Sequence, residues 1–223
     1  MRQNPLNGDL WNKPLRENGN GRSTNQPMMP ERKILVFATH NANKAREVQE
    51  MLGDTYDVRS LTDIGCHDEI PEDADTLEGN ARIKARYVVE HFQLDCFADD
   101  TGLEVDALGG APGVRTARFA GETADAQANM SKLLKEMGGT RNRKARFRTV
   151  FCVIQGQEER LIEGVCEGEI ATEQSGAAGF GYDPIFIPIG HAVTFAEMTS
   201  EAKNAISHRG KAVVGMVNAL LER

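Results

Sequence analysis

A continuous apolar run that leads directly into a helix is the feature that most limits the fold of this chain. Residues Lys33–Thr39, with sequence KILVFAT, form an uninterrupted stretch of strand length, which is typical of a strand buried on both faces. Asn41 or Asn43 can cap a helix that follows at once, carries apolar residues at helical spacing and ends at Gly53. The pattern predicts an α/β protein.

The rest of the chain continues to alternate strands and helices. A Gly156-Gln157 turn joins two neighbouring strand-like segments, so the sheet is expected to be mixed rather than wholly parallel. The periodicity predicts strands at Tyr56–Ser60, Cys96–Ala98, Ala145–Gln155 and Leu161–Ile170, and helices at Leu77–Phe92, Ala124–Met137 and Ser207–Leu221.

Residues 1–32 have a different composition from the rest of the chain. They are rich in Asn, Gly, Pro and Arg and hold few apolar side chains, too few to offset the entropy of ordering such a segment. They contain no apolar run after a basic start, which argues against a secretory signal. We expect one domain at residues 33–223, preceded by an extension at 1–32 that is disordered or lies upstream of a true start near Met28 or Met29.

Composition excludes several classes of function. No stretch approaches the roughly 20 apolar residues that a membrane span requires, so no membrane role is expected. Residues 1–32 carry a net charge of +2, which leaves −9 for the remainder and disfavours a nucleic-acid partner. The four cysteines are widely spaced and form no CxxC pair, as expected for reduced thiols in the cytoplasm. The histidines lack zinc-ligand spacing, so oxygen should hold any metal.

The junction of the first strand and helix is a candidate phosphate site. Its residues are Thr39, His40, Asn41, Ala42, Asn43 and Lys44. Unpaired N–H groups and the helix dipole favour an anion at such a junction, and Lys44 adds a full charge. An ordinary Asn-capped helix with a solvent-facing lysine is the alternative. The Walker pattern GxxxxGK[ST] is absent from the sequence.

Two adjacent carboxylates, Asp99 and Asp100, are candidate catalytic residues. They follow the predicted strand Cys96–Ala98, at whose carboxyl end an α/β fold places such groups. Paired carboxylates suit a hard cation such as Mg²⁺, which leaves its remaining positions to phosphates and water. Glu72 can supply a further ligand. The alternatives are a polar turn for Asp99-Asp100-Thr101-Gly102 and a solvated surface loop around Glu72.

Further candidate residues lie on the later elements. Asn80 and Lys84 are four residues apart, so they share one helix face. Lys203, His208 and Arg209 gather cationic groups near the start of the last helix, a second natural anion site. Phe180-Gly181-Tyr182-Asp183 offers two aromatic faces for a base and a carboxylate for a ring N–H. The alternatives are an exposed lysine, a structural histidine and a glycine-rich turn beside core aromatics.

In this order, the segments resemble the inosine triphosphate pyrophosphatase family, the non-canonical purine NTP pyrophosphatases. The resemblance runs from about Lys33 to the C-terminus. It rests on Ala38–Lys44 through Glu47, Glu78–Ala81 with Lys84, Ala98–Leu103, Gly109–Gly113, Gly179–Pro184 and Ile206–Gly210. The acidic loop Asp68–Asp75 departs from the double-Glu pattern of the family, and residues 1–32 match nothing in it.

The resemblance implies an elongated mixed α/β fold with two lobes and a central cleft, a homodimer, and Mg²⁺-dependent hydrolysis of ITP, dITP and XTP to the monophosphate and pyrophosphate. It implies Asp100 as metal ligand and general base, supported by Asp99, with Glu72 joining the metal. It implies phosphate contacts from Thr39, Asn41, Lys44, Lys84 and Thr101, and nucleoside contacts from Phe180, Gly181, Tyr182, Asp183, Lys203, His208 and Arg209. Two other functions stay open: a non-catalytic nucleotide sensor, and a pyrophosphatase for modified pyrimidine or canonical triphosphates.

Overall fold

The computed structural model describes residues 32–221, so the expected N-terminal extension lies outside the described residues except for Arg32. The strands are β1 (Lys33–Phe37), β2 (Tyr56–Arg59), β3 (Cys96–Val105), β4 (Pro112–Gly113), β5 (Lys144–Gln155), β6 (Glu158–Ile170) and β7 (Phe186–Pro188). The α-helices are α1 (Ala42–Leu52), α2 (Leu77–Phe92), α3 (Ala126–Glu136), α4 (Ser200–Ile206) and α5 (His208–Leu221).

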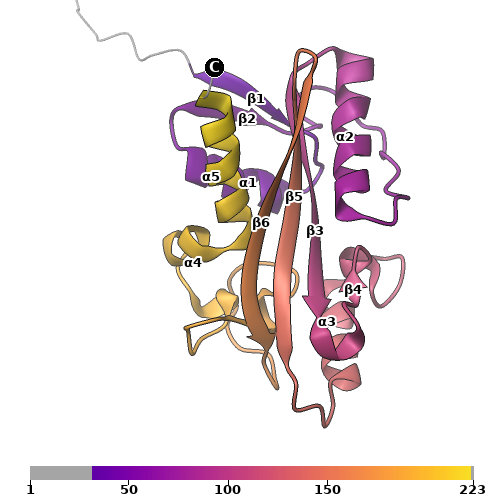
Figure 1. Cartoon of the computed structure of the whole chain (residues 1–223), viewed down its shortest axis with the longest axis vertical. Helices are drawn as coiled ribbons and strands as arrows, with labels where there is room; N and C mark the ends of the chain where they lie inside the picture. Colours follow the sequence, from indigo (N-terminus) through magenta and orange to yellow (C-terminus); the bar gives the residue numbers. More distant parts are fainter. Residues whose placement is uncertain (1–31, 222–223) are drawn as a thin grey trace, which may run out of the picture. The chain divides into compact units, whose positions relative to one another are not determined.

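The strands form one mixed sheet, as the sequence predicts. Its order is β2-β1-β3-β5-β6-β7, with β4 paired to β3 off this path. Strands β2, β1 and β3 run parallel, whereas β3, β5, β6 and β7 pair antiparallel. Figure 1 shows α2 and α5 on opposite sides of the long strands β3, β5 and β6. Within residues 32–221, no helix combines the length and apolar character needed to cross a bilayer.

Successive side chains of β1 and β3 point to opposite faces of the sheet. One face is covered by α2 and the other by α1 and α5. Phe37 and Phe97 pack with α1 and α5, whereas Ala38 and Ala98 pack with α2. A third core joins the far halves of β3 and β5 to α3, to β7 and to the 3-10 helix at Phe195–Glu197. Because successive strand residues face opposite sides, Asp99 and Asp100 must leave β3 on different faces.

The starts of α1 and α2 agree with the sequence prediction. Asn41 caps α1 by accepting hydrogen bonds from the N–H groups of Asn43 and Lys44, and Gly53 ends the helix. Thr76 caps α2 by accepting from the N–H of Gly79. These caps satisfy N–H groups that have no partner within a helix, which explains why the boundaries could be read from residue type.

The structure differs from the sequence prediction around β3, β6 and α5. Strand β6 begins at Glu158, three residues before the predicted Leu161, because its pairing with β5 extends to the turn at Gly156-Gln157. The strand expected at Cys96–Ala98 continues to Val105, because its ten residues pair with β5 along their whole length. The two carboxylates therefore lie in mid-strand, past Phe97, where the pairing with β1 ends. A short helix, α4, precedes the predicted last helix, and the extended backbone of Ser207 separates α4 from α5.

Candidate active site

A cavity of about 1130 Å³ lies where β1, α1 and the middle of β3 meet the loop at 109–118 and the start of α5. Ala42 and Asp99 are the two predicted site residues that do not line it. The predicted residues that line it are Thr39, His40, Asn41, Asn43, Lys44, Glu72, Lys84, Thr101, Asp100, Phe180, Gly181, Tyr182, Asp183, Lys203, His208 and Arg209.

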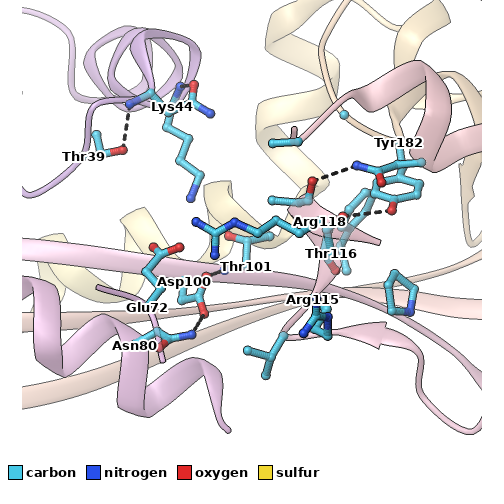
Figure 2. A pocket seen from close by; sticks show the side chains of 18 of the residues that line it. Thr39, Lys44, Glu72, Asn80, Asp100, Thr101, Arg115, Thr116, Arg118 and Tyr182 are labelled. Carbon is cyan, nitrogen blue, oxygen red and sulfur yellow. Dashed lines mark hydrogen bonds between the residues drawn. The ribbon is translucent and has the colours of Figure 1, made fainter. Parts of the chain in front are cut away.

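Asp100 leaves β3 on the α2 side and is nearly buried. Asn80 Nδ2 donates to Asp100 Oδ2 over 3.0 Å, and the Thr101 N–H donates to Oδ1 over 2.9 Å. One helical turn beyond Asn80, Lys84 Nζ contacts Glu72 Oε1. Figure 2 shows Glu72 and Asp100 directed into the same part of the pocket, with Asn80 beneath them.

The charges around Asp100 oppose one another. Burial raises the pKa of the Asp100 carboxyl, and nearby Glu72 acts in the same direction, whereas Lys84 and Lys44 act against them. Burial alone would lower the pKa of Lys84, but the charges of Asp100, Asp99 and Glu72 raise it. Asp100 is thus a carboxylate whose negative charge the fold compensates incompletely.

Asp99 faces the other side of the sheet and is fully paired. Lys44 Nζ lies 2.8 Å from its Oδ1, Arg209 Nη2 lies 3.4 Å from its Oδ2, and Thr101 Oγ1 donates to Oδ2 over 3.1 Å. Burial opposes ionisation, but Lys44 and Arg209 hold the pKa of Asp99 well below its usual range. The expectation that Asp99 and Asp100 act as a side-by-side carboxylate pair is therefore wrong, because strand alternation separates them.

The start of α1 differs from the expected anion site. The Asn43 and Lys44 N–H groups donate to Asn41 Oδ1 at 3.0 and 3.2 Å, so these two groups are not unpaired. The Asn41 N–H donates in turn to Thr39 Oγ1 over 3.1 Å. His40 is exposed and its Nε2 lies 2.9 Å from the carbonyl oxygen of Asp68. The cation at this part of the cavity is the Lys44 side chain, which is itself paired with Asp99.

A buried ion-pair network lines another part of the cavity and is connected to Asp99 through Arg209. Lys203 Nζ lies 2.6 Å from Glu47 Oε1 and 2.8 Å from Asp183 Oδ2. The same ammonium group lies 5.1 Å from the centre of the Phe180 ring, within cation–π distance. Arg209 Nη1 lies 2.5 Å from Glu47 Oε2, and its guanidinium carbon lies 5.6 Å from the centre of the Phe180 ring. Phe180 is therefore a partly exposed aromatic face next to two cations.

Two buried nitrogen atoms in this network have no partner among the described residues. They are His208 Nδ1 and Arg209 Nε. The His208 ring stacks on Phe147, with ring centres 4.6 Å apart. Burial, and then the charge of Arg209, lowers the pKa of His208 well below its usual range, so its ring is neutral at pH 7. Buried polar atoms without partners are rare, and here they border a cavity that can hold a ligand.

Tyr182 was expected to offer a second face for stacking the base, but the structure places its ring in the core. Its ring is 3% exposed and belongs to the third core, and its hydroxyl donates to the carbonyl oxygen of Thr116 over 2.9 Å. Figure 2 shows this bond at the side of the pocket. Asp183 is also buried, and its Oδ2 accepts from the Phe180 N–H over 2.8 Å. Burial raises the pKa of Asp183, although Lys203 opposes this.

Several residues around the cavity had no assigned role in the sequence analysis. Glu47 lies one helical turn after Lys44, a spacing that could have indicated a shared face. Thr149 Oγ1 donates to the carbonyl oxygen of Asp100 over 3.1 Å and lies 2.8 Å from Thr101 Oγ1. This pairing depends on the β3–β5 register, which residue type does not reveal. Arg115 and Arg118, three residues apart after the predicted Gly109–Gly113 loop, also line the cavity.

The residues near Asp100 fit one divalent cation. Among residues 32–221, no three His, Cys, Asp or Glu side chains gather as a preformed metal centre. Mg²⁺, however, is commonly held by one or two carboxylates together with substrate phosphates and water. Asp100 and Glu72 supply two such groups, and burial, together with the nearby charge of Glu72, raises the pKa of Asp100. A cation bound there would neutralise negative charge on these two carboxylates.

Known proteins share both the sequence and the fold of this chain. The dITP/XTP pyrophosphatase of Flavobacterium psychrophilum is 50% identical over 184 residues, which cover 82% of this chain and 97% of that protein. The solved structure of a HAM1 protein from Coxiella burnetii matches with a TM-score of 0.78 and 37% identity, covering 86% of this chain and all of that one.

A second solved structure, a nucleoside-triphosphatase / dITP/XTP pyrophosphatase from Mycobacterium abscessus, is 40% identical with a TM-score of 0.67 and covers 85% of this chain and 100% of that one. The sequence pattern of the Ham1 family matches residues 35–219, which include every residue of the cavity described above. The chain therefore belongs to the Ham1 family.

Proposed function

We propose that this protein hydrolyses the non-canonical purine nucleoside triphosphates dITP, XTP and ITP to the monophosphate and pyrophosphate. The observation that carries the proposal is the arrangement of one cavity. A nearly buried carboxylate, Asp100, lies close to Lys44 and Lys84, and a partly exposed aromatic ring of the same cavity, Phe180, lies beside the two cations Lys203 and Arg209. Two relatives that are 50% identical to this chain are named dITP/XTP pyrophosphatases, which supports the same substrate class.

The cavity places phosphate-binding and base-binding groups in separate regions. Lys44 and Lys84 supply positive charge on either side of β3, where phosphoryl oxygens gain negative charge during hydrolysis. Phe180 offers the base a face for stacking, and Lys203 and Arg209 supply donors beside it. A nucleoside triphosphate bound in this direction directs its phosphates toward Asp100.

Asp100 is the proposed general base and metal ligand. Asn80 and the Thr101 N–H hold its two oxygens in place, and each carboxylate oxygen can accept a further hydrogen bond from water. When bound to Asp100 and Glu72, Mg²⁺ supplies Lewis-acid polarisation of the phosphates. Lys44 and Lys84 neutralise the charge that remains on the phosphoryl oxygens. Asp99 acts indirectly by holding Lys44 and Arg209 in position.

We further propose that the protein is a cytoplasmic homodimer. The four cysteines are buried and free, the state that a reducing compartment maintains. The oligomeric state is expected from the family resemblance. Sedimentation velocity on the purified chain tests it, and a monomer at all concentrations would refute the dimer.

The activity is tested by incubating the purified protein with dITP, XTP, ITP, ATP and a modified pyrimidine triphosphate, each with Mg²⁺ or with EDTA. Separate assays for pyrophosphate and orthophosphate identify which phosphoanhydride bond is broken. We expect pyrophosphate from the first three substrates and almost none after EDTA treatment. Arg59→Ala is a suitable control variant, because this exposed residue pairs with Asp57 on β2, away from the cavity.

Other outcomes would support the alternative functions. Binding of dITP without any product would indicate a nucleotide sensor. Equal or faster turnover of ATP or of the modified pyrimidine triphosphate would indicate the broader pyrophosphatase. Release of orthophosphate instead of pyrophosphate would contradict the proposed bond cleavage.

A further inference from the structure

The cations on the wall formed by α1, α2, α4 and α5 are already paired with carboxylates. Each cationic side chain there forms an ion pair with a partner that is no more than about one-third exposed. The pairs are Lys44 with Asp99, Lys84 with Glu72, Lys203 with Asp183 and Glu47, and Arg209 with Glu47 and Asp99. A triphosphate carries several negative charges, so this wall by itself offers it little net positive charge.

The wall formed by residues 109–118 carries more cationic than acidic side chains. Arg115 precedes and Arg118 ends the 3-10 helix η2 (Thr116–Arg118), and both line the cavity. They share one carboxylate among the described residues: Glu122 lies 3.0 Å from Arg115 Nη2 and 3.7 Å from Arg118 Nε. Two guanidinium groups against one carboxylate leave a net positive charge on this wall.

The shared carboxylate is also easy to replace. Glu122 is 76% exposed, and exposed ion pairs contribute little to stability. Figure 2 shows the Arg118 side chain extending from η2 across the pocket toward Asp100 and Thr101, with Arg115 nearby. Guanidinium groups bind phosphate oxygens in a bidentate manner, which compensates for the loss of a weak carboxylate contact.

From this geometry we infer that Arg115 and Arg118 form a binding site for the pyrophosphate part of the substrate, with Glu122 as a competing anion. The inference rests on the proposed function, because it requires that the triphosphate binds in this cavity. The two arginines contact the β- and γ-phosphates, whereas Lys44 and Lys84 contact the phosphate nearest Asp100. The monophosphate product lacks the groups that reach the arginines.

Calorimetric titration with inorganic pyrophosphate and Mg²⁺ tests the site without requiring turnover, and titration with inosine monophosphate is the matched reference ligand. The double variant Arg115→Ala/Arg118→Ala should weaken pyrophosphate binding by about tenfold or more, the effect expected for lost charge-assisted hydrogen bonds. Its affinity for inosine monophosphate should not change. Glu122→Gln should tighten pyrophosphate binding by about two- to threefold, since it removes the competitor.

Arg59→Ala is the control, because Arg59 is exposed and ion-paired as Arg118 is but lies outside the cavity. Unchanged pyrophosphate affinity in the double variant, an equal loss of affinity for both ligands, or weaker binding in Glu122→Gln would overturn the inference. Failure of the proposed function is a separate result, namely no pyrophosphate released from dITP by the unmodified protein. The binding experiment remains interpretable in that case.

Discussion

At the scale of single residues, Asp99 and Asp100 show how one step along a strand changes the role of a carboxylate. Asp99 faces Lys44 and Arg209, which lower its pKa, whereas burial near Glu72 raises the pKa of Asp100. The first environment stabilises a permanent charge. The second leaves a charge available to a ligand, which is the arrangement expected of a functional group.

Asp100→Asn should reduce turnover of dITP by about 10² or more, because the variant loses the proposed base and metal ligand. The measurement is kcat/KM for dITP in the presence of Mg²⁺. Asp106→Asn, an exposed change on the residue that follows β3, is the matched control and should leave kcat/KM unchanged. Turnover near that of the unmodified protein in folded Asp100→Asn would remove Asp100 from the mechanism.

The same variant should not lose stability at pH 7. Since burial raises the folded-state pKa of Asp100 above its ordinary value of 3.8, its contribution to stability is complete below that pH. The contribution is lost as pH rises through the raised pKa, so at pH 7 the ionised carboxylate opposes folding. Asp100→Asn should therefore melt at or above the temperature of the unmodified protein in calorimetry. A clearly lower melting temperature would show that the charge stabilises the fold.

Asp99→Asn should have the opposite effect on stability. Its lowered pKa means that the stabilising charge is present above pH 3.8 and is lost as pH falls through the lowered value. Removing it leaves the partly exposed Lys44 and the buried Arg209 without this partner, and breaking a buried pair costs about 3–5 kcal/mol. Urea unfolding at pH 7 measures the change. A loss below about 1 kcal/mol would mean that neighbouring groups compensate.

At the scale of secondary-structure elements, the sequence predicted the helices better than the long strand β3. Asn41 and Gly53 mark helix ends by local chemistry, and the structure confirms these ends. By contrast, Asp99-Asp100-Thr101-Gly102 has the composition of a turn but continues as a strand, because β5 pairs with every residue of it. Tertiary pairing of this kind does not appear in local periodicity.

The candidate site could also be predicted only in part from the sequence. Residue type and order identified most of the side chains that line the cavity. The sequence could not show which of them neutralise one another, since Glu47 meets Lys203 across more than 150 positions of the chain. It also could not show that Tyr182 is held in the core, because aromatic residues serve equally in cores and in binding sites.

The contact between β6 and α5 positions two residues of the site. A Cβ on Gly164 would lie 2.0 Å from the carbonyl oxygen of His208 and 2.7 Å from the backbone nitrogen of Ala212. Gly164→Ala must therefore displace the start of α5, with His208 and Arg209. We expect a lower melting temperature and at least a tenfold loss of kcat/KM for dITP, since small misplacements near the chemistry are costly.

Gly215→Ala is the comparison for this variant, because its Cβ would meet a methyl group of Ile162 and no backbone atom, and alanine favours a helix. Its losses should be smaller. If Gly164→Ala retained both stability and activity, close packing of α5 on β6 would not determine the geometry of the site.

At the scale of the whole molecule, we propose that residues 33–223 form the catalytic domain and that residues 1–32 are dispensable for it. The family pattern begins at residue 35. Deletion of residues 1–30 should therefore leave melting temperature and kcat/KM for dITP nearly unchanged. A marked fall in either quantity would assign the N-terminal residues a part in folding or catalysis.

The choice of base depends on groups contributed by distant parts of the chain. The ammonium of Lys203 has three donors, and Glu47 and Asp183 account for two of them. The buried Arg209 Nε, also a donor, has no partner among residues 32–221. Both side chains lie beside Phe180, the proposed stacking face. The base site therefore presents hydrogen-bond donors to a ring that stacks there.

This pattern predicts selection for 6-oxo purines. Hypoxanthine and xanthine present an acceptor at O6, whereas adenine presents an amino donor at the same position. Adenine would leave the donors of Lys203 and Arg209 unsatisfied, at a cost of about 1–3 kcal/mol for each buried group. Guanine shares O6 with hypoxanthine and can be rejected only at its 2-amino group, so discrimination against GTP should be weaker than against ATP.

We therefore expect kcat/KM for dITP and XTP to exceed that for ATP by about 10² or more and to exceed that for GTP by a smaller factor. Arg209→Ala should lower turnover of ITP more than it lowers residual turnover of ATP, because the variant loses a donor that can pair with a 6-oxo group but not with the amino group of adenine. Steady-state assays with these five substrates measure both effects. Similar kcat/KM for ATP and ITP in the unmodified protein would show that these donors do not read position 6, and the substrate range would then be set by the phosphates alone.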